Sequence, residues 1–148
     1  MSTETSTKNR EVVRSLYEDC INRGKGELLV QSFAPDFVGA NGERGPEGYA
    51  QTIASVKTGT PDVQFRIDDL VATDDKVVVR WSWEGTHTGP FRGFPATHKR
   101  ITNTGIAIYH FRDGKIVRAW LETDRLGVLQ QIGAIPEKLA PAAPPAKP

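Results

Sequence analysis

The sequence predicts an α+β domain in which N-terminal helices pack on a mostly antiparallel sheet. Apolar residues recur at helical spacing ahead of Gly59, whereas from Val63 onward apolar and polar residues alternate as they do in strands. Turn signals separate the alternating stretches, so consecutive strands are expected to pair as hairpins. Two or three helices followed by at least four strands is the pattern of an α+β fold.

Length and composition fit one globular domain. Of the 148 residues, 38% are hydrophobic and 25% are charged, which argues against a wholly disordered chain. We expect a single domain at residues 7–136. Residues 1–6 show no periodicity and residues 137–148 are rich in Pro and Ala, so we expect a disordered start and a disordered tail.

A first amphipathic helix is predicted ahead of Gly24, which suits a left-handed C-terminal cap. A short second apolar segment ends at Pro35. A third helix is expected from Pro46, which suits the first helical position, and it stops at Gly59. The apolar stripes of these segments are Val13, Leu16, Tyr17, Cys20 and Ile21, then Leu28, Leu29 and Phe33, and finally Tyr49, Ile53 and Val56.

The first two predicted strands cover residues 63–71 and 77–87, with a turn at residues 73–75. Val77, Val79, Trp81 and Trp83 share one face of the second strand, which is therefore the face to bury. Residues 88–99 contain two glycines and two prolines, which indicates a long ordered loop or a strand crossover.

Two further strands are expected at residues 101–112 and 115–124. They are joined at Asp113-Gly114, a strong hairpin signal. A short helix is predicted around residues 126–132. If the sheet curls, the aromatic face of the second strand and the helix stripes enclose an apolar volume, which is a typical place for a small-molecule pocket.

Charge and cysteine content argue against several functions. The net charge of +1 gives no field for a nucleic-acid or membrane partner, and no apolar run approaches the ~20 residues that span a bilayer. Cys20 alone forms neither an intrachain disulfide nor a cysteine metal cluster, so we expect a cytoplasmic protein. The three histidines, at positions 87, 98 and 110, lack chelating spacing, so we expect no metal.

Several motifs in the strand half closely resemble the SnoaL-like polyketide cyclases, also called the ester cyclase family, of the nuclear-transport-factor-2-like superfamily. The motifs are GTHTG at residues 85–89, DGKIV at residues 113–117, Trp120 with Asp124, and QIG at residues 131–133. The resemblance runs from about residue 7 to residue 136. It implies a cone-shaped α+β barrel in which the helices close a strongly curved sheet around a deep apolar cavity.

The resemblance also implies a small-molecule enzyme that works without a cofactor. The better-known members close rings of polyketide intermediates by an intramolecular aldol reaction, and others are hydroxylases, dehydratases or pericyclic cyclases. We therefore expect an enzyme that cyclises, dehydrates or isomerises an apolar cyclic secondary-metabolite intermediate. The alternatives are a SnoaL-like hydroxylase and a non-catalytic module for ligand binding or dimerisation, because one fold hosts several functions.

The acid/base dyad of the aldol cyclases is missing. Counted from Asp113-Gly114, the family's Asp position falls on Leu121 and its His position on Ala107, and neither side chain transfers a proton. A three-residue loop with a bulge at Gly114 would pair Ala107 with Leu121. His110 and Asp124 do not replace the dyad, because that register separates them along the sheet and a two-residue turn places them on opposite faces.

Two residues remain as candidate acid/base groups. Asp124 ends the last strand and can act as a general base, or it can cap the helix that follows. His87 follows an aromatic strand and can bond a substrate oxygen, or it can be a turn histidine bonded to backbone. The candidate substrate-binding residues, which can equally be plain core, are Trp81, Trp83, Tyr109, Leu121, Tyr17, Tyr49 and Phe37.

A homodimer is also expected. Trp120 alternates to the side away from Leu121, and in the bulged register Ile106 and Ile108 share that side. An apolar patch on the outer face of the sheet favours pairing with a second copy.

Overall fold

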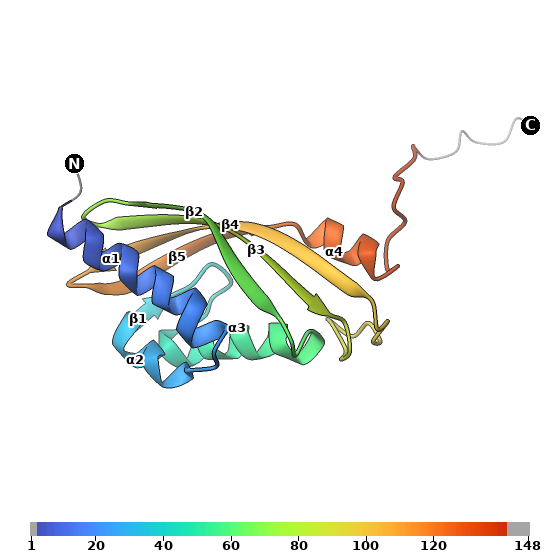
Figure 1. The fold of residues 1–148 in the computed structure, drawn as a ribbon, viewed down its shortest axis with the longest axis horizontal. Helices are drawn as coiled ribbons and strands as arrows, with labels where there is room; N and C mark the ends of the chain where they lie inside the picture. Colours follow the sequence, from blue (N-terminus) through green and yellow to red (C-terminus); the bar gives the residue numbers. More distant parts are fainter. Residues whose placement is uncertain (1–2, 142–148) are drawn as a thin grey trace, which may run out of the picture.

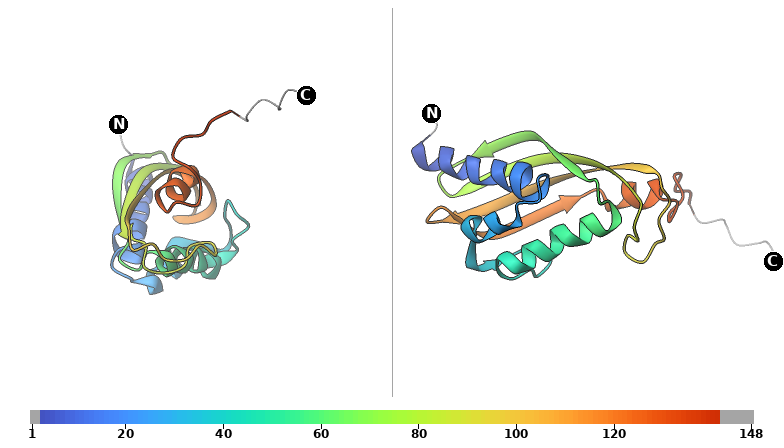
Figure 2. Two further views of the ribbon diagram at one scale, coloured as in Figure 1. Left: turned by 90° about the vertical axis from the view of Figure 1, so that its right-hand side faces the viewer. Right: turned by 60° about the horizontal axis from the view of Figure 1, so that its bottom comes forward.

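The computed structural model describes residues 3–141, in which four α-helices pack on one five-stranded mixed sheet (Figure 1). The strand order is β1-β5-β4-β3-β2, with β1 parallel to β5 and every other neighbouring pair antiparallel. The predicted α+β class and the mostly antiparallel sheet are confirmed. Figure 2 shows the sheet curving around α1 and α3, which close its concave side.

Helix α1 (Glu4–Ser15) begins three residues earlier than the sequence indicated. Thr3 caps it in a capping box with Ser6, whose backbone N–H donates to the Thr3 hydroxyl at 3.0 Å. Residues 4–6, which we assigned to a disordered start, are therefore helical. The Thr-x-x-Ser pattern replaces the usual acidic partner by a hydroxyl, and this is why the signal is weak in the sequence.

The helix continues as a π-helical segment, η1 (Leu16–Ile21), in which the N–H of Asn22 donates to the carbonyl of Tyr17 at 3.0 Å. π-Helical turns are rare and concentrate at functional sites. Tyr17 is buried and lies at the cavity described below. The widened turn therefore lies at the point where this helix reaches the cavity.

A strand that the sequence did not indicate follows two short helices. The 3₁₀ turn η2 (Gly26–Leu28) and α2 (Leu29–Ser32) lead into β1 (Phe33–Val38), which pairs with β5 only at two irregularly spaced positions. Pro35 is tolerated because β1 is an edge strand, where a missing N–H costs no ladder hydrogen bond.

Helix α3 (Gly45–Gly59) begins with Pro46 in its first turn, as predicted. Strands β2 (Gln64–Ala72) and β3 (Lys76–Thr86) form the expected hairpin, with an irregularity between Ile67 and Asp69. Residues 88–99 form a loop between β3 and β4 and contain no regular strand.

The last hairpin joins β4 (Arg100–Arg112) to β5 (Lys115–Thr123), and its register differs in detail from the prediction. Asp113 and Gly114 have φ values of 51° and 77°, so they form a two-residue turn in which Arg112 pairs with Lys115. The ladder then shifts between His110 and Phe111, and this restores the pairing of Ala107 with Leu121. The predicted pair is correct, but the bulge lies within the strands and not at Gly114.

Helix α4 (Arg125–Gln131) follows β5, as expected. Residues 137–141 contain neither helix nor strand, and the rest of the expected tail lies outside the described residues. Across the described part of the chain, none of the helices combines the length and the apolar character needed to cross a membrane.

Candidate functional site

A cavity of about 960 Å³ opens between the concave face of the sheet, η1, α3 and the segment at residues 39–44. Small-molecule sites usually measure about 300–1,000 Å³, so this cavity has room for a ligand of several fused rings. The curvature of the sheet creates the space, because a flat sheet would pack directly on α3.

All seven side chains that we selected as substrate-binding candidates line this cavity. They are Tyr17, Phe37, Tyr49, Trp81, Trp83, Tyr109 and Leu121. The alternating pattern of β3, β4 and β5 therefore identified the concave face correctly. Their role in binding substrate stays a prediction.

The indole of Trp81 lies directly over Gly105 on the neighbouring strand. A Cβ at position 105 would overlap the six-membered ring, so only glycine leaves room for this placement. Phe65 packs edge-on against the indole with 5.0 Å between ring centroids. These contacts hold Trp81 flat on the cavity wall.

Three tyrosine hydroxyls meet at one side of the cavity. The oxygen of Tyr109 lies 2.7 Å from that of Tyr17 and 3.0 Å from that of Tyr49, so Tyr109 connects the other two. The three side chains come from β4, η1 and α3, which are far apart in the sequence. We call this group the tyrosine cluster.

Burial raises the pKa of each member of the tyrosine cluster well above its usual value. For Tyr17, the neighbouring Tyr49 adds to this effect, whereas the Tyr109 hydroxyl and the Trp81 N–H act in the opposite direction. All three phenols therefore stay protonated at neutral pH and can donate hydrogen bonds.

The cluster has hydrogen-bond donors to spare. Three hydroxyl protons are present, but the two hydrogen bonds inside the cluster use only two of them. The N–H of Trp81 lies close enough to the Tyr17 oxygen to lower the pKa of that phenol, but it is buried and its geometry completes no hydrogen bond among residues 3–141. One O–H and one N–H are thus available to an acceptor in the cavity, such as a carbonyl oxygen.

The positions of the missing dyad are apolar in the structure as well. Ala107 and Leu121 are paired across the hairpin, and both line the cavity. Ala107 lies two residues before Tyr109 on β4. Neither side chain carries a proton to transfer. Acid/base chemistry in this cavity must come from other residues.

Asp124 is the N-cap of α4 and is not part of the cavity wall. Its carboxylate accepts a hydrogen bond from the N–H of Gly127 at 2.9 Å, and the residue is exposed. A Cβ on Gly127 would overlap that carboxylate, so the glycine accommodates the cap. This geometry favours the capping alternative, and a catalytic role for Asp124 stays a prediction.

The variant Asp124→Asn tests that role. Asparagine caps helices about as well as aspartate, so we expect thermal stability to change by no more than about 0.5 kcal/mol. Because the carboxylate lies outside the cavity wall, we expect turnover of a cavity ligand to be unchanged. A large loss of turnover at unchanged melting temperature would assign Asp124 a chemical role.

His87 is fully buried directly after β3 and also lies outside the cavity wall. Its Nδ1 accepts a hydrogen bond from the N–H of Thr97 at 3.3 Å and lies 3.0 Å from the Thr97 hydroxyl. The ring thus ties β3 to the loop at residues 88–99, which favours the structural alternative. A catalytic role for His87 likewise stays a prediction.

Glu43 is one of the cavity residues that sequence reasoning missed. It is half-buried, it lies in the segment between β1 and α3, and it belongs to the cavity wall. In the sequence, the surrounding GANGERG stretch indicates only a glycine-rich loop. An acidic residue between glycines was the available signal, but it carries no periodicity that would direct it inward.

Metal-ligating side chains are dispersed. Within residues 3–141, no three His, Cys, Asp or Glu side chains are grouped closely enough to hold a metal ion. The donor groups that do converge are phenol and indole, which suit an organic oxygen atom and not a cation.

Comparisons with known proteins agree on one family. A family model for the SnoaL-like polyketide cyclase matches residues 11–132, whereas no curated protein matches the chain. A candidate polyketide cyclase from Acidithiobacillus ferrooxidans is 30% identical, with a TM-score of 0.77 over 90% of this chain and 99% of that one.

Two further solved structures share the fold. A candidate SnoaL-like polyketide cyclase from Jannaschia Sp. CCS1 superposes with a TM-score of 0.82 at 22% identity, over 92% of this chain and 99% of that chain. AclR from Streptomyces galilaeus, a candidate hydroxylase, superposes with a TM-score of 0.80 at 20% identity, over 90% of this chain and 86% of that chain. The curved sheet, its helices and the family match together place this chain in the SnoaL-like polyketide cyclase family.

Proposed function

We propose that the protein is a cofactor-independent enzyme that binds an apolar cyclic ketone and stabilises its enolate. The observation that carries the proposal is the tyrosine cluster, with its unused O–H and the unused N–H of Trp81, on the aromatic part of the cavity wall. The aromatic walls select a flat apolar ring system, and the donors orient its carbonyl oxygen.

Donors fixed in this way act on the transition state. As a carbonyl becomes an enolate, negative charge develops on oxygen, and preorganised donors in a water-poor site stabilise that charge. Removal of one such donor from an enzyme typically costs about 10²–10³ in rate. The raised pKa values of the phenols keep their protons in place for this role.

An enolate leads to each of the reactions that the family resemblance suggests. Attack of the enolate carbon on a second carbonyl closes a ring, and loss of a β-hydroxyl group dehydrates the substrate. Return of the proton to another carbon isomerises it. Binding a flexible substrate in one orientation can add ~7 kcal/mol or more to catalysis. The name of AclR suggests a hydroxylase as the alternative, but at 20% identity that likeness supports the fold alone.

Two probes test the proposal. β-Naphthol mimics an enolate when it ionises, so we expect its pKa to fall by about one unit or more on binding, measured by absorbance during pH titration. β-Tetralone, a bicyclic ketone, should exchange its α-hydrogens in deuterium oxide faster with protein than in buffer, measured by proton NMR. Tight binding of naphthol without a pKa change and without exchange would identify a ligand-binding module instead.

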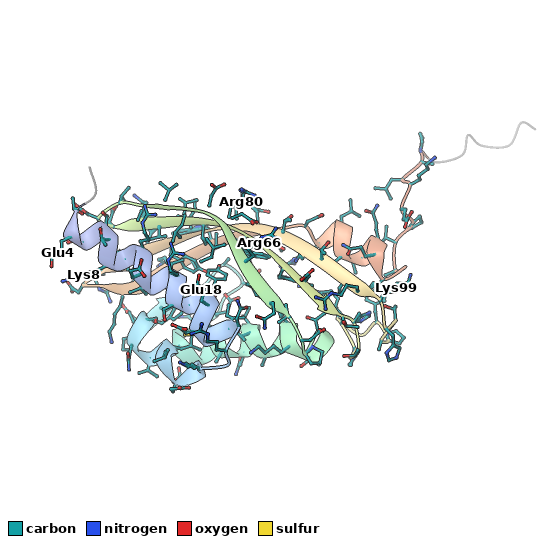
Figure 3. The ribbon with its side chains drawn as sticks, in the orientation of Figure 1. Glu4, Lys8, Glu18, Arg66, Arg80 and Lys99 are labelled. Atoms are coloured by element: carbon teal, nitrogen blue, oxygen red, sulfur yellow. The ribbon has the colours of Figure 1, made fainter. Side chains whose placement is uncertain are left out.

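We also propose that the outer face of the sheet joins two copies of the chain. Four large apolar side chains are exposed there, with exposed fractions from 36% to 61%: Val71, Ile106, Ile108 and Trp120. Figure 3 shows Arg80 on the side of the sheet that faces away from α3, where it pairs with Asp69 at 2.6 Å. Charges of both signs border this apolar patch, and such a border can pair with itself about a two-fold axis.

Trp120→Glu tests the dimer. Trp120 packs against His110 at the centre of β5 and is 49% exposed, so a glutamate would place a charge in the proposed interface. We expect light scattering at micromolar concentration to give a dimer for the wild type and a monomer for the variant. Val30→Glu, at a more exposed apolar position on α2, should stay dimeric. A monomeric wild type would exclude the proposal.

A further inference from the structure

Glu43 belongs to a segment built to hold its carboxylate in the cavity. Oε2 accepts a hydrogen bond from the backbone N–H of Asn41 at 3.0 Å, and Oε1 accepts one from the Thr52 hydroxyl at 3.2 Å. The segment itself is closed by the N–H of Gly39, which donates to the Glu43 carbonyl at 2.8 Å. Figure 2 shows this segment leading directly into α3, which carries Thr52.

Two glycines make room for this arrangement. A Cβ at position 39 would overlap the carboxylate oxygen of Glu43, and a Cβ at position 48 would lie 3.1 Å from its Cα and Cβ. The side chain therefore folds back across Gly39 instead of extending into solvent. Its two carboxylate oxygens are fixed from opposite sides by loop and helix.

The carboxylate acts electrostatically on the tyrosine cluster. Burial is the main cause of the raised pKa of Tyr49 and Tyr109, and the negative charge of Glu43 contributes to both. None of the ion pairs among the described residues includes Glu43. Its charge is therefore free to act on groups in the cavity.

From this placement we propose that Glu43 is the general base, which removes a proton from the carbon next to the carbonyl of the bound substrate. The inference rests on the proposed function and deepens it, because enolate formation needs a base as well as donors. It also replaces the missing dyad: the carboxylate comes from the segment before α3 and not from β5.

The step is a simple proton transfer. A Glu43 oxygen takes the α-proton, the electron pair of the broken C–H bond forms the enolate double bond, and the carbonyl π pair moves to oxygen. The cluster hydroxyl and the Trp81 N–H bond that oxygen. Return of the proton from the Glu43 carboxyl to carbon completes an isomerisation, and in deuterium oxide it exchanges hydrogen for deuterium.

The variant Glu43→Gln removes the base and keeps the side-chain shape. We expect β-tetralone exchange to fall about 10²–10⁴-fold, the usual contribution of a general base. Glu27→Gln is the matched control, because this exposed carboxylate of η2 does not line the cavity. Its exchange rate should stay at the wild-type value.

β-Naphthol separates a base from a structural brace. Loss of the negative charge of Glu43 favours an oxyanion nearby, so bound naphthol should ionise at lower pH in Glu43→Gln than in the wild type. A brace predicts the opposite, since a loosened cavity would weaken both binding and ionisation. If Glu43→Gln does not fold, Glu43→Asp provides the test. Aspartate keeps the negative charge but is one methylene shorter. If Glu43 is the base, this variant should exchange β-tetralone more slowly and still bind naphthol.

The outcomes distinguish this inference from the proposed function. Glu43 is not the base if exchange is unchanged in Glu43→Gln, or if exchange and the ionisation of bound naphthol are both weakened in that variant. The enolate function still stands in either case if Tyr109→Phe slows exchange. A wild-type protein that neither exchanges β-tetralone nor shifts the pKa of naphthol overturns both.

Discussion

Replacing Tyr109 with phenylalanine should lower the rate of β-tetralone exchange by about 10²–10³-fold, the usual cost of one lost oxyanion donor. Tyr109 is the central hydroxyl and holds both Tyr17 and Tyr49. Without it, the two outer hydroxyls no longer share a partner and cannot present a fixed donor. The pKa of bound β-naphthol should return toward its value in water.

Stability should fall as well, but less than activity. Two buried hydroxyls each lose one partner in Tyr109→Phe, and such a loss costs about 1–3 kcal/mol in the free energy of unfolding. Thermal unfolding measures this change independently of the exchange rate. Wild-type exchange by a folded Tyr109→Phe protein would contradict the role of the cluster.

The outer members of the cluster provide the comparison. Tyr17→Phe and Tyr49→Phe each remove one hydroxyl and leave one hydrogen bond of the cluster in place. The spare proton lies on one side of the cluster, so the two variants should differ in their effect on exchange. The more damaging substitution identifies the hydroxyl that faces the substrate oxygen.

The walls of the cavity could be predicted because alternation in a strand fixes which side chains share a face. Val79, Trp81 and Trp83 on β3 all point to the buried side, as the sequence indicated. The pairing of Ala107 with Leu121 was also correct, although the two-residue turn and the bulge act together to give it. A single bulge shifts the cross-strand register by one residue, so it decides which residues pair and which face of the sheet they occupy.

Other features lack a periodic signal. Strand β1 contains Pro35 and pairs at only two positions along the parallel edge, so neither alternation nor a turn marks it. Glu43 is directed inward by the close approach of Gly39 and Gly48, a contact that the order of residues does not reveal. The sequence contains the tyrosines of the cluster, but only tertiary packing brings together η1, α3 and β4.

High pH should unfold the protein steeply, beginning near pH 10. Burial raises the pKa of Tyr17, Tyr49 and Tyr109 in the folded chain, whereas tyrosine in an unfolded chain ionises near pH 10. Below about pH 10 the folded and the unfolded chain both keep these protons, so the cluster adds no pH dependence to the stability there. Above it the unfolded chain loses protons that the folded chain retains, and the folded state loses stability.

The expected slope is large. Each retained proton lowers the free energy of unfolding by about 1.4 kcal/mol per pH unit, so three tyrosines give up to about 4 kcal/mol per unit. Domains are usually stable by about 5–15 kcal/mol, and a few pH units therefore suffice to unfold this one. Circular dichroism across a pH titration measures the transition.

The same titration contains its own control, because the chain has only three tyrosines and all belong to the cluster. Tyrosinate absorbance should rise together with the loss of circular dichroism, since the phenols cannot ionise until the fold opens. Tyr49→Phe should reduce the slope by about a third, because one of three retained protons is gone. Tyrosinate that forms near pH 10 in a protein that is still folded would show that the cluster is open to solvent, and the donors proposed for the enolate would then be exchanging with water.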